Sequence, residues 1–412
     1  MNKLLLKLAI LSVSLLTIMA GAAISPALGT IALAFPDASD TTIKLILTLP
    51  SVMIIPFIFV SSYLTRRFSK KQILFIGMFF YLIGGLAGGL VSKIELLLFF
   101  RAILGIGVGL MIPISTSLVA DFFDDEERTA TMGQVSAANN LGGVVLFLMS
   151  GMLAAISWRV AFSVYSLVIV AALIVFLYLP HTKPDRSLSK VKLERLPKKL
   201  YVYGTAMFLI VLAFYSIPVN MALFMQQEGI GNSKNAGAVI SVATATGFFA
   251  GLLLGRVKRL LQTNFIAIQL LLMAIGFFVL GNSSQVFFIG IGVGFMGFGF
   301  GSIIPTVFDQ VSRQVPKTQT VQAMAIVTSM LFFGQFFSPL FYHGVGVLFA
   351  NETIRFLYMF FATSTFLVAI VFFALAFRVR FRHKKKLTSI SRQLVTYPEV
   401  NKNEIKDTDT AI

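Results

Sequence analysis

Long apolar runs recur along the whole chain and constrain its fold more than any other feature. Runs of about 18 to 25 residues are separated by short polar segments, and each is long enough to cross a ~30 Å hydrocarbon layer as a helix. Only 12% of the 412 residues are charged and 57% are hydrophobic, whereas a soluble protein is about one quarter charged. We therefore expect an all-α membrane protein.

The sequence predicts twelve membrane spans in two sets of six. A polar linker at 181–200 separates an N-terminal six-helix bundle at 1–180 from a C-terminal bundle at 201–377, and a basic and polar tail follows at 378–412. Residues 1–23 could also be read as a secretory signal, but the apolar stretch continues to Ile31, so we interpret it as the first span. The expected spans are 8–31, 42–62, 72–92, 96–120, 131–155, 160–180, 201–224, 236–255, 264–281, 285–308, 321–343 and 355–377.

Basic residues predict the orientation of these spans. Of 34 lysines and arginines, 28 fall on the side of the two termini, five fall on the other side, and Arg101 lies within a span. This bias predicts a protein of the plasma (inner) membrane with both termini cytoplasmic. It also explains the net charge of +17 without a nucleic-acid partner. The basic tail is expected to contact anionic membrane lipids.

The two halves repeat a short glycine pattern. Gly105-Ile-Gly-Val-Gly109 reappears as Gly290-Ile-Gly-Val-Gly294, in the fourth span of each half. Small residues four apart let helices approach closely, so Gly105, Gly107 and Gly109 are expected to pack against neighbouring helices, as is the series Gly247, Gly251 and Gly255. Parallel repeats of six spans are typical of one large class of transporters.

Three segments carry a family resemblance. The segment SYLTRRFSKKQIL (62–74) matches Gly-x-Leu-x-Asp-Arg-x-Gly-Arg-Lys at Leu64, Arg67, Lys70 and Lys71, although Arg66 replaces the aspartate. Arg101 with its following glycines matches a fourth-span signature, and DFFDDEER (121–128) matches an acidic link. Over residues 5–380 the sequence resembles the major facilitator superfamily.

The resemblance implies two six-helix bundles around a central cavity, with links at the cytoplasmic face that latch the halves. The residues expected to contribute to this conformational gating are Arg67, Lys70, Lys71, Asp121, Arg128 and Asp309. Positive-inside charge or a solvated acidic turn would explain the same residues without gating. The Gly-Pro pair that drug antiporters of the family often carry in the fifth span is absent, although Gly142, Gly143 and Gly151 are present.

Arg101 is the most informative residue within a span. A central arginine costs about 2.5–3.5 kcal/mol on insertion scales, so it should face protein or water. One interpretation is a cation in the central cavity that binds an anionic or polar group or aids proton release. The alternative is a side chain that reaches the outer headgroups.

Uncharged polar residues within spans are the other candidates for substrate binding or coupling, although each could simply bond a neighbouring helix. These candidates are Asn139, Asn140, Asn220, Gln226 and Gln335. No acidic residue lies near the middle of a span, so a proton carrier would be an acid at a helix end, such as Asp121 or Asp309, or His343. Some of the 42 phenylalanines and 16 methionines are expected to line a pliable apolar cavity.

Several chemistries are not expected. The chain has no cysteine and only three scattered histidines, His181, His343 and His383, which argues against disulfides and a metal site. No phosphate-binding Gly-x-x-x-x-Gly-Lys loop or catalytic constellation is found, so we expect neither a cofactor nor an enzyme.

The preferred functional hypothesis is a secondary transporter that exports a small drug-like molecule or metabolite in exchange for protons. The alternatives are nutrient uptake by the same fold and a membrane sensor without flux.

Overall fold

The computed structural model describes residues 3–123, 125–180, 196–316 and 319–396. Within these ranges the side chains of residues 22, 120, 125–126, 128–130, 321 and 379–396 are not described. All regular structure in the described residues is helical, as expected. Most of the predicted linker at 181–200 lies outside the described residues.

The N-terminal half contains the following helices: α1 (Lys3–Ala22), η1 (Ser25–Ala27), α2 (Leu28–Ala34), α3 (Asp40–Leu64), α4 (Lys70–Leu86), η2 (Ala87–Gly89), α5 (Ile94–Phe122), α6 (Asp125–Ile156), α7 (Trp158–Ala161), η3 (Phe162–Ser166) and α8 (Leu167–Tyr178). The C-terminal half contains α9 (Lys198–Phe214), α10 (Ser216–Gln227), α11 (Ser233–Leu261), η5 (Gln262–Asn264), α12 (Phe265–Asn282), α13 (Val286–Gln314), α14 (Thr320–Leu348) and α15 (Ile354–Thr396).

The described residues contain 11 segments that are long and apolar enough to cross a membrane, so the expected number of twelve is not confirmed. The difference arises at Ser233–Asn282, a single 50-residue segment that holds the expected eighth and ninth spans. Only the short η5 separates α11 from α12 there, and Gln262 adopts a left-handed φ of 47°. A straight helix of that length would measure about 75 Å, more than twice the hydrocarbon thickness.

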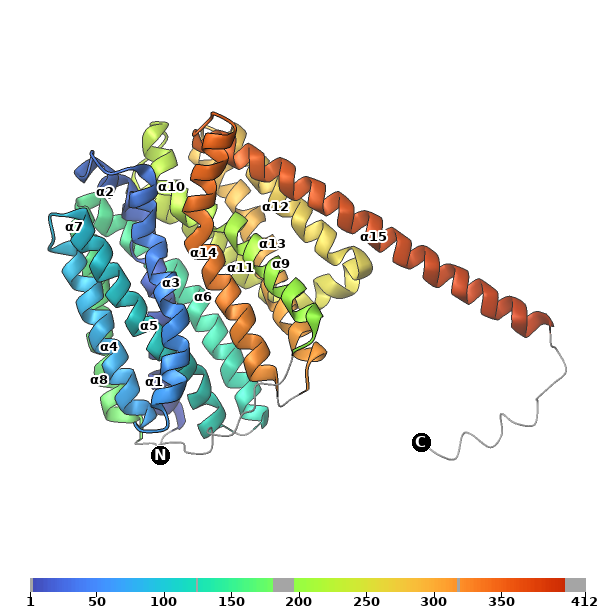
Figure 1. Ribbon diagram of the computed structural model, residues 1–412, viewed down its shortest axis with the longest axis horizontal. Helices are drawn as coiled ribbons and strands as arrows, with labels where there is room; N and C mark the ends of the chain where they lie inside the picture. The colour runs from blue at the N-terminus through green and yellow to red at the C-terminus, as the bar shows by residue number, and fades with distance from the viewer. Residues whose placement is uncertain (1–2, 124, 181–195, 317–318, 397–412) are drawn as a thin grey trace.

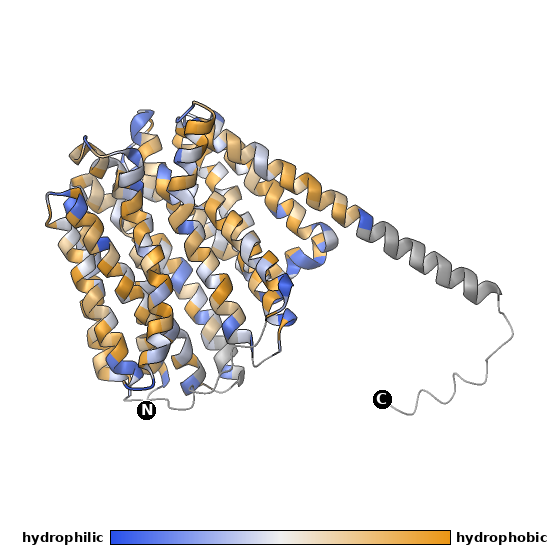
Figure 2. Ribbon diagram, in the orientation of Figure 1, coloured by the Kyte–Doolittle hydropathy of each residue, from blue (hydrophilic) through white to orange (hydrophobic). Residues whose placement is uncertain are grey.

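The helices have two distinct ends. The start of α1, the end of α13, the start of α14 and the connections at 65–69 and 262–264 lie at one end, called here the basic face (Figure 1). The connections at 35–39 and 349–353 lie at the other end, called the distal face. Apolar residues cover most of the helix surfaces between these faces (Figure 2), as lipid contact requires.

The two halves pack their glycine-rich helices in the same way. α5 packs against α3 and α4, and α13 packs against α11 and α12. A Cβ added at Gly107 would lie 2.5 Å from the carbonyl oxygen of Gly77 on α4, and one at Gly292 would lie 2.9 Å from that of Gly276 on α12. Backbones this close leave no room for a side chain.

The glycine pattern in the sequence and the packing agree only in part. Gly105 and Gly109 press against α3, where added Cβ atoms would lie 2.5 Å from Pro50 O and 2.7 Å from Ile54 O. Their counterparts by sequence pack differently, because Gly290 has no neighbour within 4 Å and Gly294 makes only ordinary contacts.

The helix contact expected at Gly247, Gly251 and Gly255 is found only at Gly247. Gly247 packs against Gly301, whereas Gly251 and Gly255 have nothing within 4 Å. Both Gly251 and Gly255 are exposed, and Gly251 lines a cavity.

We expect Gly107→Leu to lower the free energy of unfolding by about 1–3 kcal/mol or more, because the side chain would force α5 away from α4. Thermal unfolding of the purified protein in detergent measures this loss. Gly290→Leu is the matched control and should leave the melting temperature nearly unchanged. Equal melting temperatures for the two variants would contradict the packing account.

Candidate functional site

Two adjoining cavities lie between the halves. The larger, called the entry cavity, has a volume of about 580 Å³ and is lined by residues of α6, α9, α11 and α13. The smaller, called the central cavity, has a volume of about 350 Å³ and is lined by residues from both halves. Both cavities share Phe214, Ala243 and Thr244. Their volumes fall within the range of small-molecule sites, which is about 300–1,000 Å³.

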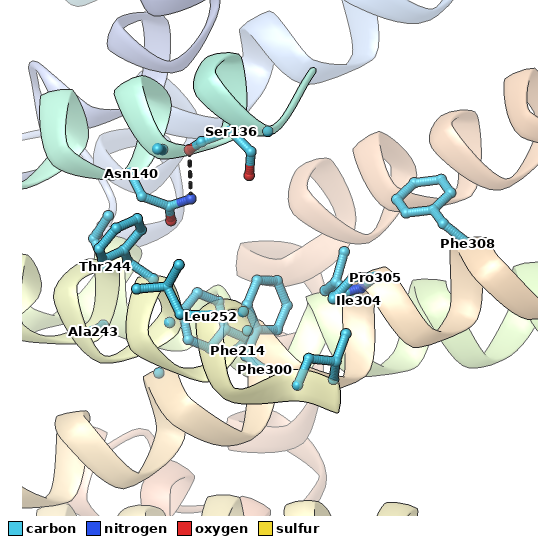
Figure 3. A pocket seen from close by; sticks show the side chains of 18 residues that line it. Ser136, Asn140, Phe214, Ala243, Thr244, Leu252, Phe300, Ile304, Pro305 and Phe308 are labelled. Atoms are coloured by element: carbon cyan, nitrogen blue, oxygen red, sulfur yellow. Dashed lines mark hydrogen bonds between the residues drawn. The ribbon is translucent and has the colours of Figure 1, made fainter. Parts of the chain in front are cut away.

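The entry cavity presents few polar groups. Figure 3 shows Ser136 and Asn140 of α6 facing Phe214, Phe300 and Leu252 across the open space. The Asn140 amide nitrogen donates to the Ser136 carbonyl oxygen at 2.8 Å. The rings of Phe214 and Phe300 stack with their centroids 3.7 Å apart. This arrangement offers a flat aromatic wall opposite a carboxamide.

A hydrogen bond at the central cavity joins the two halves. The hydroxyl of Ser51 on α3 donates to the side-chain oxygen of Gln335 on α14 at 2.8 Å, and both residues line the cavity. Tyr215, at the break between α9 and α10, lines it as well. A bound compound could therefore exchange hydrogen bonds with groups of both halves.

The lining of the two cavities is uncharged. No Asp, Glu, Lys, Arg or His is found among their described lining residues. Phenylalanines line them as expected, but methionines do not. Such a lining suits an apolar or weakly polar compound, because an ion would lose its hydration without gaining a counter-ion.

The space between the halves is closed at the distal face. Ser25 of η1 donates to the carbonyl oxygen of Pro218 on α10. A Cβ at Gly29 of α2 would lie 2.9 Å from the carbonyl oxygen of Ala222. On α6, a Cβ at Gly151 would lie 2.8 Å from the carbonyl oxygen of Ser233 at the start of α11. Farther along, α6 and α11 line the entry cavity, so the space widens toward the basic face.

Arg101 is buried within the N-terminal half, with 0% of its surface exposed. Its nitrogens donate to the carbonyl oxygens of Ile46 and Ala20, each at 2.7 Å, and to the hydroxyl of Tyr165 at 2.6 Å. The Tyr165 hydroxyl donates in turn to Ala20 O at 3.0 Å. In this conformation the side chain is therefore buried in the protein and lines neither cavity, and its role in substrate binding or coupling stays a prediction.

The arginine instead connects α5 with α1, α3 and η3. Burying a guanidinium is costly unless its donors are satisfied, and here carbonyl and hydroxyl oxygens satisfy them.

The other polar candidates are scattered. Asn139 donates to the hydroxyl of Ser14 on α1 at 2.9 Å. Asn220 is fully buried and donates to Ser216 O of its own helix at 3.1 Å. Gln226 lies near the distal face against Gly29. None of these three residues lines the two cavities, so only Asn140 and Gln335 among the predicted polar residues do so.

The predicted gating residues form separate clusters in each half at the basic face. Lys70 on α4 pairs with Asp121 on α5 at 2.6 Å. Lys71 is buried and donates to the carbonyl oxygens of Phe176 and Leu179 at 2.8 and 2.7 Å, which caps the end of α8.

Among the remaining gating candidates, Asp309 belongs to the cluster of the C-terminal half. Asp309 on α13 pairs with Arg313 at 2.9 Å and with Lys258 on α11 at 3.8 Å. Arg67 is exposed, and the side chain of Arg128 lies outside the described residues.

Sequence reasoning missed Ser51, Tyr215 and Thr244 as cavity residues. A single hydroxyl in an apolar span carries little signal, because it usually bonds its own helix. Only the pairing of α3 with α14 shows which hydroxyl faces the other half.

The chain is 30% identical over 132 residues to multidrug resistance protein 3 of Bacillus subtilis (strain 168), a match that covers 32% of this chain and only 25% of that relative. It is 22% identical over 318 residues to the bacillibactin exporter of the same organism, covering 72% of this chain and 79% of the exporter.

Solved structures show the same fold. The nucleoside transporter NupG superimposes with a TM-score of 0.72 at 12% identity, covering 90% of this chain and 99% of that one. A bacterial homolog of the human lysosomal transporter Spinster, in an inward-facing and unoccupied conformation, gives a TM-score of 0.66 at 16% identity over 90% of this chain and 94% of that one. The sequence pattern of the Major Facilitator Superfamily matches residues 10–339. The chain therefore belongs to the Major Facilitator Superfamily, as the motifs predicted.

Proposed function

We propose that this chain exports a small organic compound of little net charge by alternating access. The observation that supports this proposal is the uncharged space between the halves, which is closed at the distal face and widens toward the basic face. A compound would enter from the basic face and leave at the distal face when the halves rock. The relatives named as multidrug and bacillibactin exporters support the direction.

We further propose a topology of twelve crossings in the plasma (inner) membrane, with Ser233–Asn282 crossing twice. The length of that segment and its break at Gln262–Asn264 support the double crossing. The 28 basic residues on the side of the termini support a cytoplasmic basic face.

Within the cavities we assign substrate contact to Asn140 and Gln335, together with Ser51 and Tyr215. Their polar groups would orient the ligand, and Phe214 and Phe300 would stack against it. Protons are the proposed driving ion, because the sequence has no nucleotide-binding loop. Asp121 and Asp309, at the basic-face ends of α5 and α13, are the proposed carriers.

Export is tested by accumulation of ethidium in cells that produce the chain, because the single positive charge of this flat aromatic compound is spread over its rings and is only weakly hydrated. We expect lower accumulation than in cells without it, and an increase when the proton gradient is collapsed. Higher accumulation would indicate uptake. Saturable ethidium binding by the purified protein, without flux in liposomes, would indicate a sensor.

We expect Asn140→Trp to abolish ethidium flux, because the indole would fill the entry cavity where the carboxamide now faces the aromatic wall. Flux into liposomes that contain the purified variant measures the effect. Leu141→Trp is the matched control, since Leu141 is 54% exposed and lines neither cavity. Equal flux in both variants would contradict the assigned path.

We expect Arg101→Met to lower the free energy of unfolding by about 3 kcal/mol or more, because it leaves buried oxygens without donors. Tyr165→Phe should cost about 1 kcal/mol, and the two changes should not add, because they affect one network. Thermal unfolding of the two variants and of the double variant measures the coupling. A stable Arg101→Met protein without flux would instead place the guanidinium in the transport step.

A further inference from the structure

Titratable side chains of both halves meet at the distal face. Asp40 and Lys44 belong to α3 of the N-terminal half, and His343 belongs to α14 of the C-terminal half. Glu352 lies in the connection between α14 and α15. All four line one small cavity of about 40 Å³, which has room for about one water molecule. The cavity is thus too small to be a site for an organic ligand.

Lys44 lies deepest in this group. It is only 9% exposed, and no hydrogen bond or ion pair within the described part of the chain involves its ammonium. The acidic residues Asp40 and Glu352 line the same small cavity as Lys44. A buried ammonium without direct partners depends on such nearby anions, because removal from water is costly.

The carboxylates of Asp40 and Glu352 belong to different halves of the protein. Asp40 precedes Lys44 by one helical turn on α3 and therefore stays beside it in every conformation. Glu352 belongs to the other half, so its attraction to Lys44 exists only while the distal face is closed. Glu352 is held near His343, whose Nδ1 lies 3.8 Å from its carboxylate.

Five ion pairs found between other side chains each lie within one half. Lys3–Glu127 and Lys70–Asp121 lie within the N-terminal half. The pairs of Asp309 and the pair Arg355–Glu228 lie within the C-terminal half. These pairs persist when the halves rock as rigid bodies, so they do not favour one conformation over another.

We propose that Lys44 and Glu352 form an electrostatic latch that holds the distal face closed. This inference rests on the proposed alternating access. When the distal face opens, Glu352 moves away with the C-terminal half, and Lys44 becomes hydrated beside Asp40. The latch stabilises the closed distal face by the attraction that is lost on opening, and it thereby sets the balance between the two conformations.

The natural absence of cysteine makes this balance measurable with spin labels. One label pair, at Leu33→Cys and Leu348→Cys, reports the distal face, since these positions are 70% and 77% exposed. A second pair, at Phe68→Cys and Leu260→Cys, reports the basic face with exposures of 40% and 82%. Distance distributions from pulsed electron paramagnetic resonance give the population of each conformation.

Glu352→Lys is the decisive change, because Glu352 is a mostly exposed side chain in a connection and its replacement should not prevent folding. It turns attraction across the interface into repulsion. We expect the ratio of distal-open to distal-closed molecules to rise about threefold or more, as for a reversed charge pair near the surface. The basic-face distance should shorten in the same molecules.

Two controls separate the latch from general charge effects. Asp40→Asn removes an equal charge near Lys44 but within the same half, so the ratio should stay close to that of the unmodified protein. Lys44→Met combined with Glu352→Lys should restore the closed population, because no charge at position 44 then repels the new lysine, while Asp40 attracts it. A ratio unaffected by Glu352→Lys would overturn the latch, as would an equal response to Asp40→Asn.

Added ethidium distinguishes failure of the latch from failure of the proposed function. Distances that respond to ethidium but not to Glu352→Lys would overturn the latch alone. If the distances of both label pairs stayed unchanged in every variant, with and without ethidium, alternating access would be overturned, and the latch with it.

Discussion

Close contact between helix backbones is the constraint on which the rest of the structure depends. Lipid does not drive apolar helices together, so their association relies on small residues that let backbones touch. Gly107 against Gly77 and Gly292 against Gly276 provide such contacts at matching places in the two halves. Each half is therefore tightly packed within itself, as the proposed rocking of the halves requires.

The arrangement of charged side chains follows the division of the protein into two halves. Arg101 is buried inside one half, where oxygens of three neighbouring elements satisfy its donors. Lys71 caps the end of α8 in the same half. The cavities contain no charge among their described lining residues, and Lys44 and Glu352, which belong to different halves, line a separate small cavity at the distal face. Fixed charges thus hold each bundle together, and the moving interface is left mostly to apolar and hydroxyl contacts.

The sequence predicted the helical membrane fold and the family, because apolar run length and basic-residue bias act over many residues. It predicted the sites less well. Arg101 was correctly expected to avoid lipid, but hydropathy cannot tell a cavity from the carbonyls of Ile46 and Ala20. Asn140 and Gln335 were found because amides are rare in such spans, whereas Ser51 was missed because hydroxyls are common there. The sequence separated the expected eighth and ninth spans at 256–263, and the helix breaks there at Gln262–Asn264, so the span count depends on whether Ser233–Asn282 crosses once or twice.

Figure 1 shows α15 leaving the side of the bundle as one unbroken helix that ends at Thr396. Its 43 residues make a rod of about 65 Å, roughly twice the hydrocarbon thickness. Because the helix is continuous, a small tilt at its first turn produces a large displacement of its far end. A rotation of about 10° about its first turn would sweep the far end through about 11 Å. A fluorophore attached near that end would therefore report helix rotations that are too small to measure at the cavity.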